Sequence, residues 1–276
     1  MSDGFNEIAE SYKPELYKPD VFFLQAKEDI KSLYEEDRGK VFYIRQLQVK
    51  FEKKYFHWIT YNAIKSLISE KYLKSVPVPV TSSGTEIQFL VHYSNRYPKR
   101  DINESTKIIV EYSQDNITRS CGHRAEDLFA LALAGRRFIP VNKKVKEYKD
   151  KIWTKSDHDL DYVFENKEDG ISYGCEIKNT LGYIEKEELE IKLEICNTLS
   201  IRPLFILRYP PKTYIELVRQ AGGYVMVFVC QIYELSQDKL VKKIREKIGL
   251  PVDAPKAIPE GIINRFEKWH KRSLNQ

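Results

Sequence analysis

The sequence predicts an α/β protein with two domains: a small α+β domain at the N-terminus, followed by a larger domain in which helices flank a mixed central sheet. Three observations support this prediction. The chain of 276 residues is longer than most single cores. Helix-type and strand-type apolar patterns alternate along it. A polar segment around Pro98 separates two differently patterned regions, so we expect domains at residues 1–97 and 98–276.

The first domain is predicted to contain three helices, a short strand and a two-stranded ribbon. Gly39 is expected to end the first helix, and Thr60 is expected to cap the third. A turn at Ser82–Gly84 is expected to join the two arms of the ribbon. Helix, strand, helix, helix and ribbon is the element order of a winged-helix domain. These elements are expected, in order, at residues 21–38, 41–43, 44–54, 60–72, 74–80 and 86–92.

The second domain alternates between helices and strands. A turn at residues 166–171 is expected to join two of its strands as a hairpin. From Leu240 onward we expect a basic helix and a Pro-rich stretch. This alternation favours an α/β sandwich with a mixed central sheet. The earlier elements are expected, in order, at residues 119–135, 138–141, 159–165, 173–178, 185–199, 202–208, 213–221 and 224–229.

Composition limits the class of protein but leaves its chemistry open. With 42% hydrophobic and 31% charged residues, the chain fits a globular protein better than a disordered one. No run approaches the ~20 apolar residues of a membrane helix, and the first residues do not resemble a signal peptide; we therefore expect a cytoplasmic protein without membrane contact. The four cysteines have no paired spacing, which argues against a zinc ribbon or a disulfide framework. The net charge of +5 permits nucleic-acid binding without establishing it.

Two of the expected strands carry charged residues at a spacing of two. Residues two apart on a strand share a face, so Glu176 and Lys178 are predicted to point to the same side of the sheet. Asp159 and Asp161 share a face of the neighbouring strand by the same rule. If the two strands pair as a hairpin, several carboxylates meet one ammonium group at the sheet surface.

Such a cluster of carboxylates favours a bound divalent cation. Carboxylates that repel one another in a partly desolvated site are stabilised by Mg²⁺, with Mn²⁺ as a possible substitute, and the ion activates water for attack on phosphorus. Lys178 could orient that water, help to deprotonate it if its own pKa is depressed, and offset the negative charge that develops on the phosphate.

Asp161, followed after a gap by Glu176, Ile177 and Lys178, resembles the signature of the PD-(D/E)XK nuclease superfamily. The resemblance covers roughly residues 119–230 and implies a restriction-endonuclease-like fold. It also implies catalytic roles for Asp161, Glu176 and Lys178, with Asp161 and Glu176 as metal ligands. Glu126, on the preceding helix, matches an acidic residue that many members carry there as part of the metal site.

Two assignments around this signature stay open. Leu160 stands where many members of the superfamily have proline, so Asp159 remains an alternative to Asp161 as metal ligand. On the following helix, Glu188 and Lys192 lie one turn apart. They either face the site, where members often place an auxiliary polar residue, or form an exposed i,i+4 ion pair, which is the interpretation we favour.

The third helix of the first domain, expected to present residues 57–71, is the candidate DNA reader, because the corresponding helix of a winged-helix domain enters the major groove. Its polar face includes Tyr61, and we expect Asn62 and Lys65 to contact base edges. Arg45 is a candidate phosphate contact. A protein-binding or merely solvated face is the alternative.

A second candidate DNA contact is the lysine-rich segment that precedes the Asp161 strand. Lys144 and Lys146 lie in it, with Tyr148 and Trp153 interspersed. Basic residues with interleaved aromatic side chains are typical of loops that lie on a phosphate backbone. A flexible, solvated connection is the alternative interpretation.

Taken together, these features predict an Mg²⁺-dependent endodeoxyribonuclease acting on double-stranded DNA. A type II restriction endonuclease is the preferred interpretation, because a sequence reader fused to a nuclease domain supplies site-specific cleavage. A homodimer would cut both strands through its two-fold symmetry. A DNA repair or recombination nuclease is the nearest alternative. A non-catalytic DNA-binding regulator with a nuclease-like scaffold is a hypothesis from a different class, and metal binding distinguishes it from the others.

Overall fold

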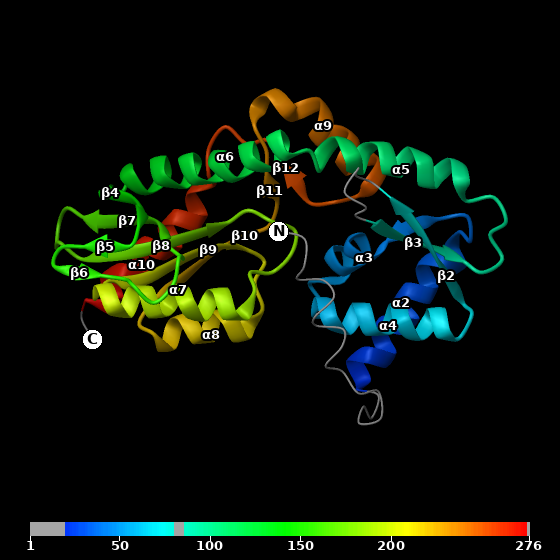
Figure 1. The fold of residues 1–276 in the computed structure, drawn as a ribbon, viewed down its shortest axis with the longest axis horizontal. Helices are drawn as coiled ribbons and strands as arrows, with labels where there is room; N and C mark the ends of the chain where they lie inside the picture. Colours follow the sequence, from blue (N-terminus) through cyan, green and yellow to red (C-terminus); the bar gives the residue numbers. More distant parts are fainter. Residues whose placement is uncertain (1–19, 80–85, 275–276) are drawn as a thin grey trace. The chain divides into compact units, whose positions relative to one another are not determined.

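The structure is a computed structural model that describes residues 20–79 and 86–274 (Figure 1). The chain divides into two compact units. Of the described residues, those from 20 to 114 and 246–250 belong to the first unit, and 115–245 and 251–274 belong to the second. Within the described residues, no helix is both long and apolar enough to cross a bilayer. The structure is mixed α/β, as the sequence predicts.

The first unit packs helices against a small antiparallel sheet. The sheet has three strands in the order β1-β3-β2, and both pairings are antiparallel. The Tyr34 hydroxyl, buried in the core, donates a hydrogen bond to the Leu90 carbonyl over 2.9 Å and so joins the first helix to the sheet. The elements are α2 Val21–Glu36, β1 Val41–Tyr43, α3 Ile44–Phe51, α4 His57–Ser69, β2 Leu73–Pro79, β3 Glu86–His92 and α5 Lys99–Tyr112.

One predicted detail of this unit, the helix cap at Thr60, is wrong, and another, the turn of the ribbon, lies outside the described residues. Helix α4 begins at His57 with Phe56 as its N-cap, so the prediction that Thr60 caps the helix is wrong. Thr60 lies one turn inside the helix and is fully buried, because that turn packs against the core. The predicted turn at Ser82–Gly84 lies outside the described residues.

The segment predicted as a domain junction is mostly helical. Helix α5 occupies Lys99–Tyr112, and the division between the units falls after Gln114 rather than at 97/98. Ile102 and Ile109, two helical turns apart, form the buried stripe of α5. The Tyr112 and Tyr43 hydroxyls are hydrogen-bonded at 2.8 Å. Ile102 is the one apolar residue in the first half of this helix, Lys99–Ser105, which was too weak a signal to predict a helix.

The second unit is built on a five-stranded mixed sheet in the order β10-β9-β8-β7-β4. Strands β8, β9 and β10 are parallel to one another, β7 is antiparallel to β8, and β4 is antiparallel to β7. The predicted mixed sheet with flanking helices is therefore confirmed. The principal elements are α6 Asp115–Ala134, β4 Phe138–Val145, β7 Leu160–Asn166, β8 Ser172–Lys178, α7 Lys186–Leu199, β9 Arg202–Arg208, α8 Lys212–Gln220, β10 Tyr224–Phe228 and α10 Glu260–Ser273.

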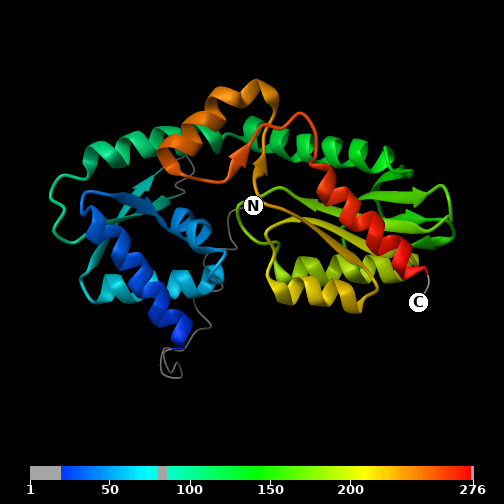
Figure 2. The same ribbon diagram turned by 180° about the vertical axis from the view of Figure 1, so that it is seen from behind.

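Helices cover both faces of this sheet. Helices α6 and α10 pack on one face, while α7 and α8 pack on the other (Figures 1 and 2). Cys175 and Ile177 of β8 belong to the core under α6 and α10. Because side chains alternate along a strand, Glu176 and Lys178 lie on the α7 face, as the spacing of two predicts.

Short elements complete the second unit. Part of the lysine-rich segment that was expected to be a loop forms the end of β4 and a small hairpin. Near the C-terminus, β11 and β12 pair in parallel, and the expected basic helix is present as α9. The short elements are β5 Glu147–Tyr148, β6 Lys151–Ile152, β11 Gln231–Ile232, the 3-10 helix Leu235–Gln237, α9 Asp238–Lys243 and β12 Val252–Asp253. The π-helix Ile244–Ile248 follows α9, and from residue 246 it belongs to the first unit.

Candidate active site

The candidate site lies where the pairing between β7 and β8 ends. The last register pair of this ladder is Tyr162 with Cys175. Asp161 directly precedes Tyr162, and here a side chain accepts the hydrogen bond in place of a backbone carbonyl. Its Oδ2 accepts a hydrogen bond from the Ile177 amide at 2.7 Å. Strand β8 continues beyond this point, paired with β9. The end of the ladder therefore places Asp161 next to the segment that carries Glu176 and Lys178.

Glu176 is almost fully buried and is held by two ammonium groups. Its side chain is 1% exposed. Its Oε1 lies 3.0 Å from Lys178 Nζ, and its Oε2 lies 2.7 Å from Lys192 Nζ. Burying an ionised carboxylate is costly unless it is paired, so these two contacts make the position tolerable for an acidic residue.

Helix α7 supplies two charged residues to the same cluster. Glu188 Oε1 lies 2.7 Å from Lys178 Nζ, and Lys192 also donates a hydrogen bond to the Asp159 carbonyl. The preferred sequence interpretation, an exposed pair between Glu188 and Lys192, is therefore wrong. Lys192 lies three residues after Leu189 and four before Cys196, both fully buried, so it belongs to the face of α7 that packs on the sheet.

Lys178 is a charged donor in this arrangement. Its burial disfavours the ammonium form, but the negative charges of Glu176 and Glu188 outweigh that effect, so the pKa of Lys178 lies above its ordinary value. The condition under which Lys178 would help to deprotonate water, a depressed pKa, is therefore not met. Its chemistry here is that of a fixed positive charge which can donate hydrogen bonds.

Asp161 has the opposite character, because its surroundings disfavour ionisation. Burial, and then the negative charge of Glu176, raise the pKa of Asp161 from 3.8 to about 7, although the Ile177 amide acts to lower it. Asp159 precedes β7 and presents its backbone carbonyl to Lys192. Of the two candidate aspartates, Asp161 is thus the one whose carboxylate is held at the end of the ladder beside β8.

Glu126 approaches from the opposite side of the sheet. It lies on α6, and its Oε2 is 3.0 Å from Lys143 Nζ. The Lys143 ammonium in turn lies 5.0 Å from the centroid of the Tyr162 ring, which faces the α6 core. The charge of Glu126 contributes to the raised pKa of Asp161, after burial and Glu176. Glu126 therefore acts on Asp161 electrostatically, while its ion-pair partner is Lys143.

The raised pKa of Asp161 leads to a prediction about stability. A carboxyl group whose pKa is higher in the folded protein stabilises the fold below its unfolded pKa, and this stabilisation is lost as pH rises through the folded value. In EDTA, we expect the unfolding free energy of Asp161→Asn to increase relative to the wild type between about pH 4 and pH 8, by at most about 4 kcal/mol. Urea denaturation at a series of pH values measures this difference. A difference that does not change with pH would contradict the assignment.

The donor atoms of Asp161 and Glu176 fit a magnesium ion in chemical terms. Among residues 20–79 and 86–274, no three His, Cys, Asp or Glu side chains form a ready-made metal site. Mg²⁺, however, is commonly bound through one or two carboxylates and keeps water or phosphate oxygens as its other ligands. A cation would also relieve the repulsion between Glu176 and Asp161 that helps to raise the Asp161 pKa. Two carboxylates are therefore a sufficient donor set.

Four DNA contacts were predicted in the first unit, and three of them lie on helix α4; the fourth, Arg45, does not. Tyr61 and Asn62 are half-buried and Lys65 is exposed, with Lys65 Nζ 5.0 Å from the centroid of the Tyr61 ring. Trp58, which is 49% exposed, lies three, four and seven residues before these side chains and therefore shares their face of the helix. This residue was not singled out from the sequence. Arg45 lies on α3, half-buried, with a guanidinium nitrogen 3.2 Å from His57 Nδ1.

The lysine-rich segment is less available than predicted. Lys144 is exposed at the end of β4, and Lys146 Nζ lies 3.3 Å from Asp157 Oδ1. Tyr148 and Trp153, expected to lie among the lysines on a loop along the phosphate backbone, are 8% and 3% exposed and belong to the core under α7. That part of the prediction is wrong, because the aromatic rings hold the small β5–β6 hairpin onto the unit.

Comparison of the chain with protein-family models, with curated proteins and with solved structures finds no match. The resemblance to the PD-(D/E)XK superfamily therefore stays a prediction, and functional reasoning starts from the arrangement of Asp161, Glu176 and Lys178 itself. The four cysteines all lie among the described residues, and no disulfide joins any two of them.

Proposed function

We propose that this protein is a Mg²⁺-dependent endonuclease that hydrolyses phosphodiester bonds in double-stranded DNA, with its active site at Asp161, Glu176 and Lys178. One observation carries the proposal. The buried Asp161 carboxyl group, whose pKa is raised by burial and by the charge of Glu176, meets Glu176 and the charged Lys178 at the end of the β7–β8 ladder. This combination supplies oxygen ligands for a cation and a fixed positive charge for a phosphate in one place.

The proposed roles follow from the contacts of each side chain. Asp161 and Glu176 hold the ion, and Glu126 assists through its charge on Asp161. When bound, Mg²⁺ supplies Lewis-acid activation of water and of the phosphate. Lys178 remains charged, orients the attacking water through a hydrogen bond and offsets negative charge on the phosphate in the transition state.

Two residues of α7 fix this arrangement. Lys192 holds Glu176 Oε2, and Glu188 holds the Lys178 ammonium. Both are positioning residues, because each acts through another side chain. Their contacts limit the rotamers open to Glu176 and Lys178, and such restriction helps a site reach productive geometry.

The first unit supports a DNA substrate. Its element order and three-stranded antiparallel sheet match those of a winged-helix domain, in which the helix equivalent to α4 enters the major groove. Trp58, Tyr61, Asn62 and Lys65 form the proposed contact face. A site-specific restriction endonuclease is the biological role we favour, with a homodimer cutting both strands. A repair or recombination nuclease is the alternative role.

The proposal is tested by incubating the purified protein with covalently closed plasmid DNA. We expect Mg²⁺ or Mn²⁺ to convert the closed circle into nicked or linear DNA, and EDTA to prevent the conversion. Asp161→Asn should lose this activity, because one of the two proposed ligands is replaced by a neutral amide. Discrete fragments from genomic DNA would favour the restriction role. A closed circle that stays intact with either metal would overturn the proposal.

A second candidate function is a DNA-binding regulator whose second unit has no catalytic role. One observation favours it: both oxygens of Glu176 are already paired with lysines, so this carboxylate is balanced without a metal. Calorimetry distinguishes the two candidates. DNA binding without any measurable binding of Mg²⁺ or Mn²⁺, together with an intact plasmid, would support the regulator.

A further inference from the structure

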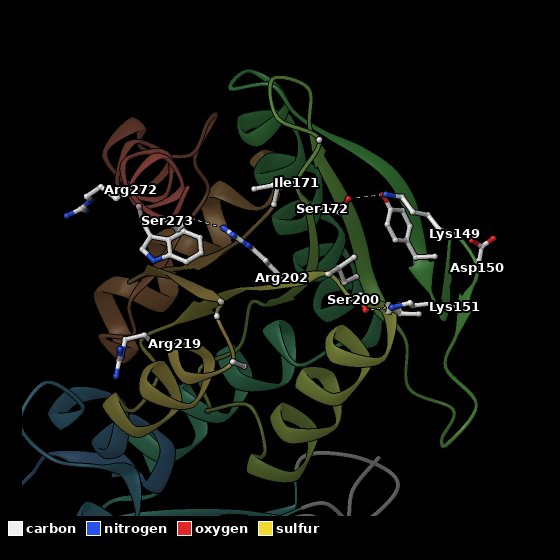
Figure 3. A pocket seen from close by; sticks show the side chains of 18 residues that line it. Lys149, Asp150, Lys151, Ile171, Ser172, Ser200, Arg202, Arg219, Arg272 and Ser273 are labelled. Atoms are coloured by element: carbon white, nitrogen blue, oxygen red, sulfur yellow. Dashed lines mark hydrogen bonds between the residues drawn. The ribbon is translucent and has the colours of Figure 1, made fainter. Parts of the chain in front are cut away.

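A pocket of about 1070 Å³ lies in the second unit at the opposite end of β8 from Lys178 (Figure 3). It is lined where β8 begins at Ser172, where α7 passes into β9 at Ser200, and where α10 ends at Ser273. The length of β8 therefore separates it from Lys178 by roughly 20 Å. Its volume is at the upper end of the range of small-molecule binding pockets.

The described lining is strongly basic. It contains a single acidic residue, Asp150. Figure 3 shows basic side chains around the opening from several elements, including the β5–β6 hairpin, β9, α8 and α10. The basic residues of the lining are Lys149, Lys151, Arg202, Arg219 and Arg272.

Several of these cations contact neutral groups. Lys151 donates a hydrogen bond to the Ser200 hydroxyl, and Arg202 NH1 donates one to the Ser273 hydroxyl at 2.8 Å (Figure 3). Arg272 Nε donates to a backbone carbonyl of its own helix. Within the described part of the chain, none of these three forms an ion pair with a carboxylate. Arg219, by contrast, is paired with Glu216 at 2.6 Å.

The negative C-terminal ends of nearby helices offset only part of this positive charge. Helices α7, α8 and α10 all end at the pocket, and a helix C-terminus carries roughly half a negative charge that favours nearby cations. Three such ends together with Asp150, Glu216 and Glu165, which interacts with Lys149, still offset fewer charges than the five cations provide. The remaining positive charge favours an anionic ligand.

The rest of the lining suits a ligand with a flat apolar part. Trp269, half-buried, lines the pocket together with Leu199 and Ile201. Gly170 and Gly222, with φ of 74° and 73°, form part of the lining, and nothing lies within 4 Å of the position of a Cβ atom on either. Backbone that lacks a side chain leaves room for a ligand to approach.

We propose that this pocket binds a free nucleoside polyphosphate, with the phosphates at Lys151 and Arg202 and the base at Trp269. Charge-assisted hydrogen bonds from lysine and arginine suit phosphate oxygens, and an indole ring suits a base. The proposal does not depend on the proposed nuclease function, because none of the pocket residues belongs to the candidate active site.

Calorimetry with the full chain in EDTA tests this proposal. The probes are ATP, adenosine and inorganic tripolyphosphate. We expect ATP to bind more tightly than either fragment, because only ATP reaches both the cations and Trp269. Combining Lys151→Gln with Arg202→Gln should weaken ATP binding at least about tenfold. Lys186→Ala is the matched control, since this exposed lysine lies at the other end of α7 and should leave ATP affinity unchanged.

Several results would overturn the proposal. Unchanged ATP affinity in the double variant would overturn it, and so would equal affinity for ATP and tripolyphosphate. Binding of a single-stranded oligonucleotide at these residues, without binding of ATP, would also overturn it. If the Arg202 substitution prevents folding, Lys151→Gln alone replaces it and should still weaken ATP binding, by less than the double variant. Repeating the titration with Lys178→Ala separates this outcome from the nuclease proposal, because ATP binding should persist without cleavage.

Discussion

Replacing Lys178 with alanine is expected to lower the rate of Mg²⁺-dependent plasmid cleavage at least about a hundredfold, the size of effect seen when one transition-state donor is removed. Lys178 is held by Glu176 and Glu188 and stays charged, so its loss removes a fixed cation from the site. Initial rates of conversion of closed circular DNA measure the effect. Affinity for the same DNA, measured by fluorescence anisotropy, should change little.

Two further variants make this prediction specific. Lys178→Arg keeps the charge but changes its geometry, so it should retain part of the activity lost in Lys178→Ala. Lys186→Ala removes an exposed lysine that is paired with Glu190, and it should cleave at the wild-type rate. Full activity in Lys178→Ala would exclude this lysine from the mechanism.

The largest effect on stability is expected at Lys192. Its side chain is 6% exposed, and its ammonium group is 2.7 Å from the buried Glu176. Replacement by methionine keeps much of the volume but leaves Glu176 with less compensation, and breaking a buried pair in this way typically costs about 3–5 kcal/mol. Urea denaturation at neutral pH should show a fall in unfolding free energy of this size.

The exposed pair between Lys186 and Glu190 provides the matched comparison on the same helix. There, Lys186→Ala should cost less than about 1 kcal/mol, because surface pairs contribute little. Combining Lys192→Met with Glu176→Gln should recover much of the stability lost in Lys192→Met alone, since the buried charge is then removed. Equal losses at Lys186 and Lys192, or no recovery in the double variant, would contradict the account of Glu176.

Local patterns in the sequence were enough to predict the core of the candidate site. The spacing of Glu176 and Lys178 indicated a shared face, and a period of two is a property of any strand. The turn between β7 and β8 indicated that Asp161 lies near them, and the antiparallel register agrees. The mixed sheet followed from the alternation of helices with strands.

Other parts of the site depend on contacts between residues distant in sequence. Glu188 and Lys192 have the spacing of a surface pair, and only the packing of α7 on the sheet turns them toward Glu176 and Lys178. Trp153 looked like an exposed aromatic among lysines, yet it packs under the same helix. Such burial is set by tertiary structure, which a local pattern does not encode.

The most direct test of the account is the location of Mn²⁺ in crystals of the protein. Mn²⁺ scatters anomalously near its absorption edge and can replace Mg²⁺ in oxygen-ligand sites. The account predicts an anomalous peak between the carboxylates of Asp161 and Glu176, within roughly 2–2.5 Å of an oxygen of each, and its loss in Asp161→Asn crystals. Crystals soaked in Mn²⁺ that show no peak between these two residues would contradict the central claim.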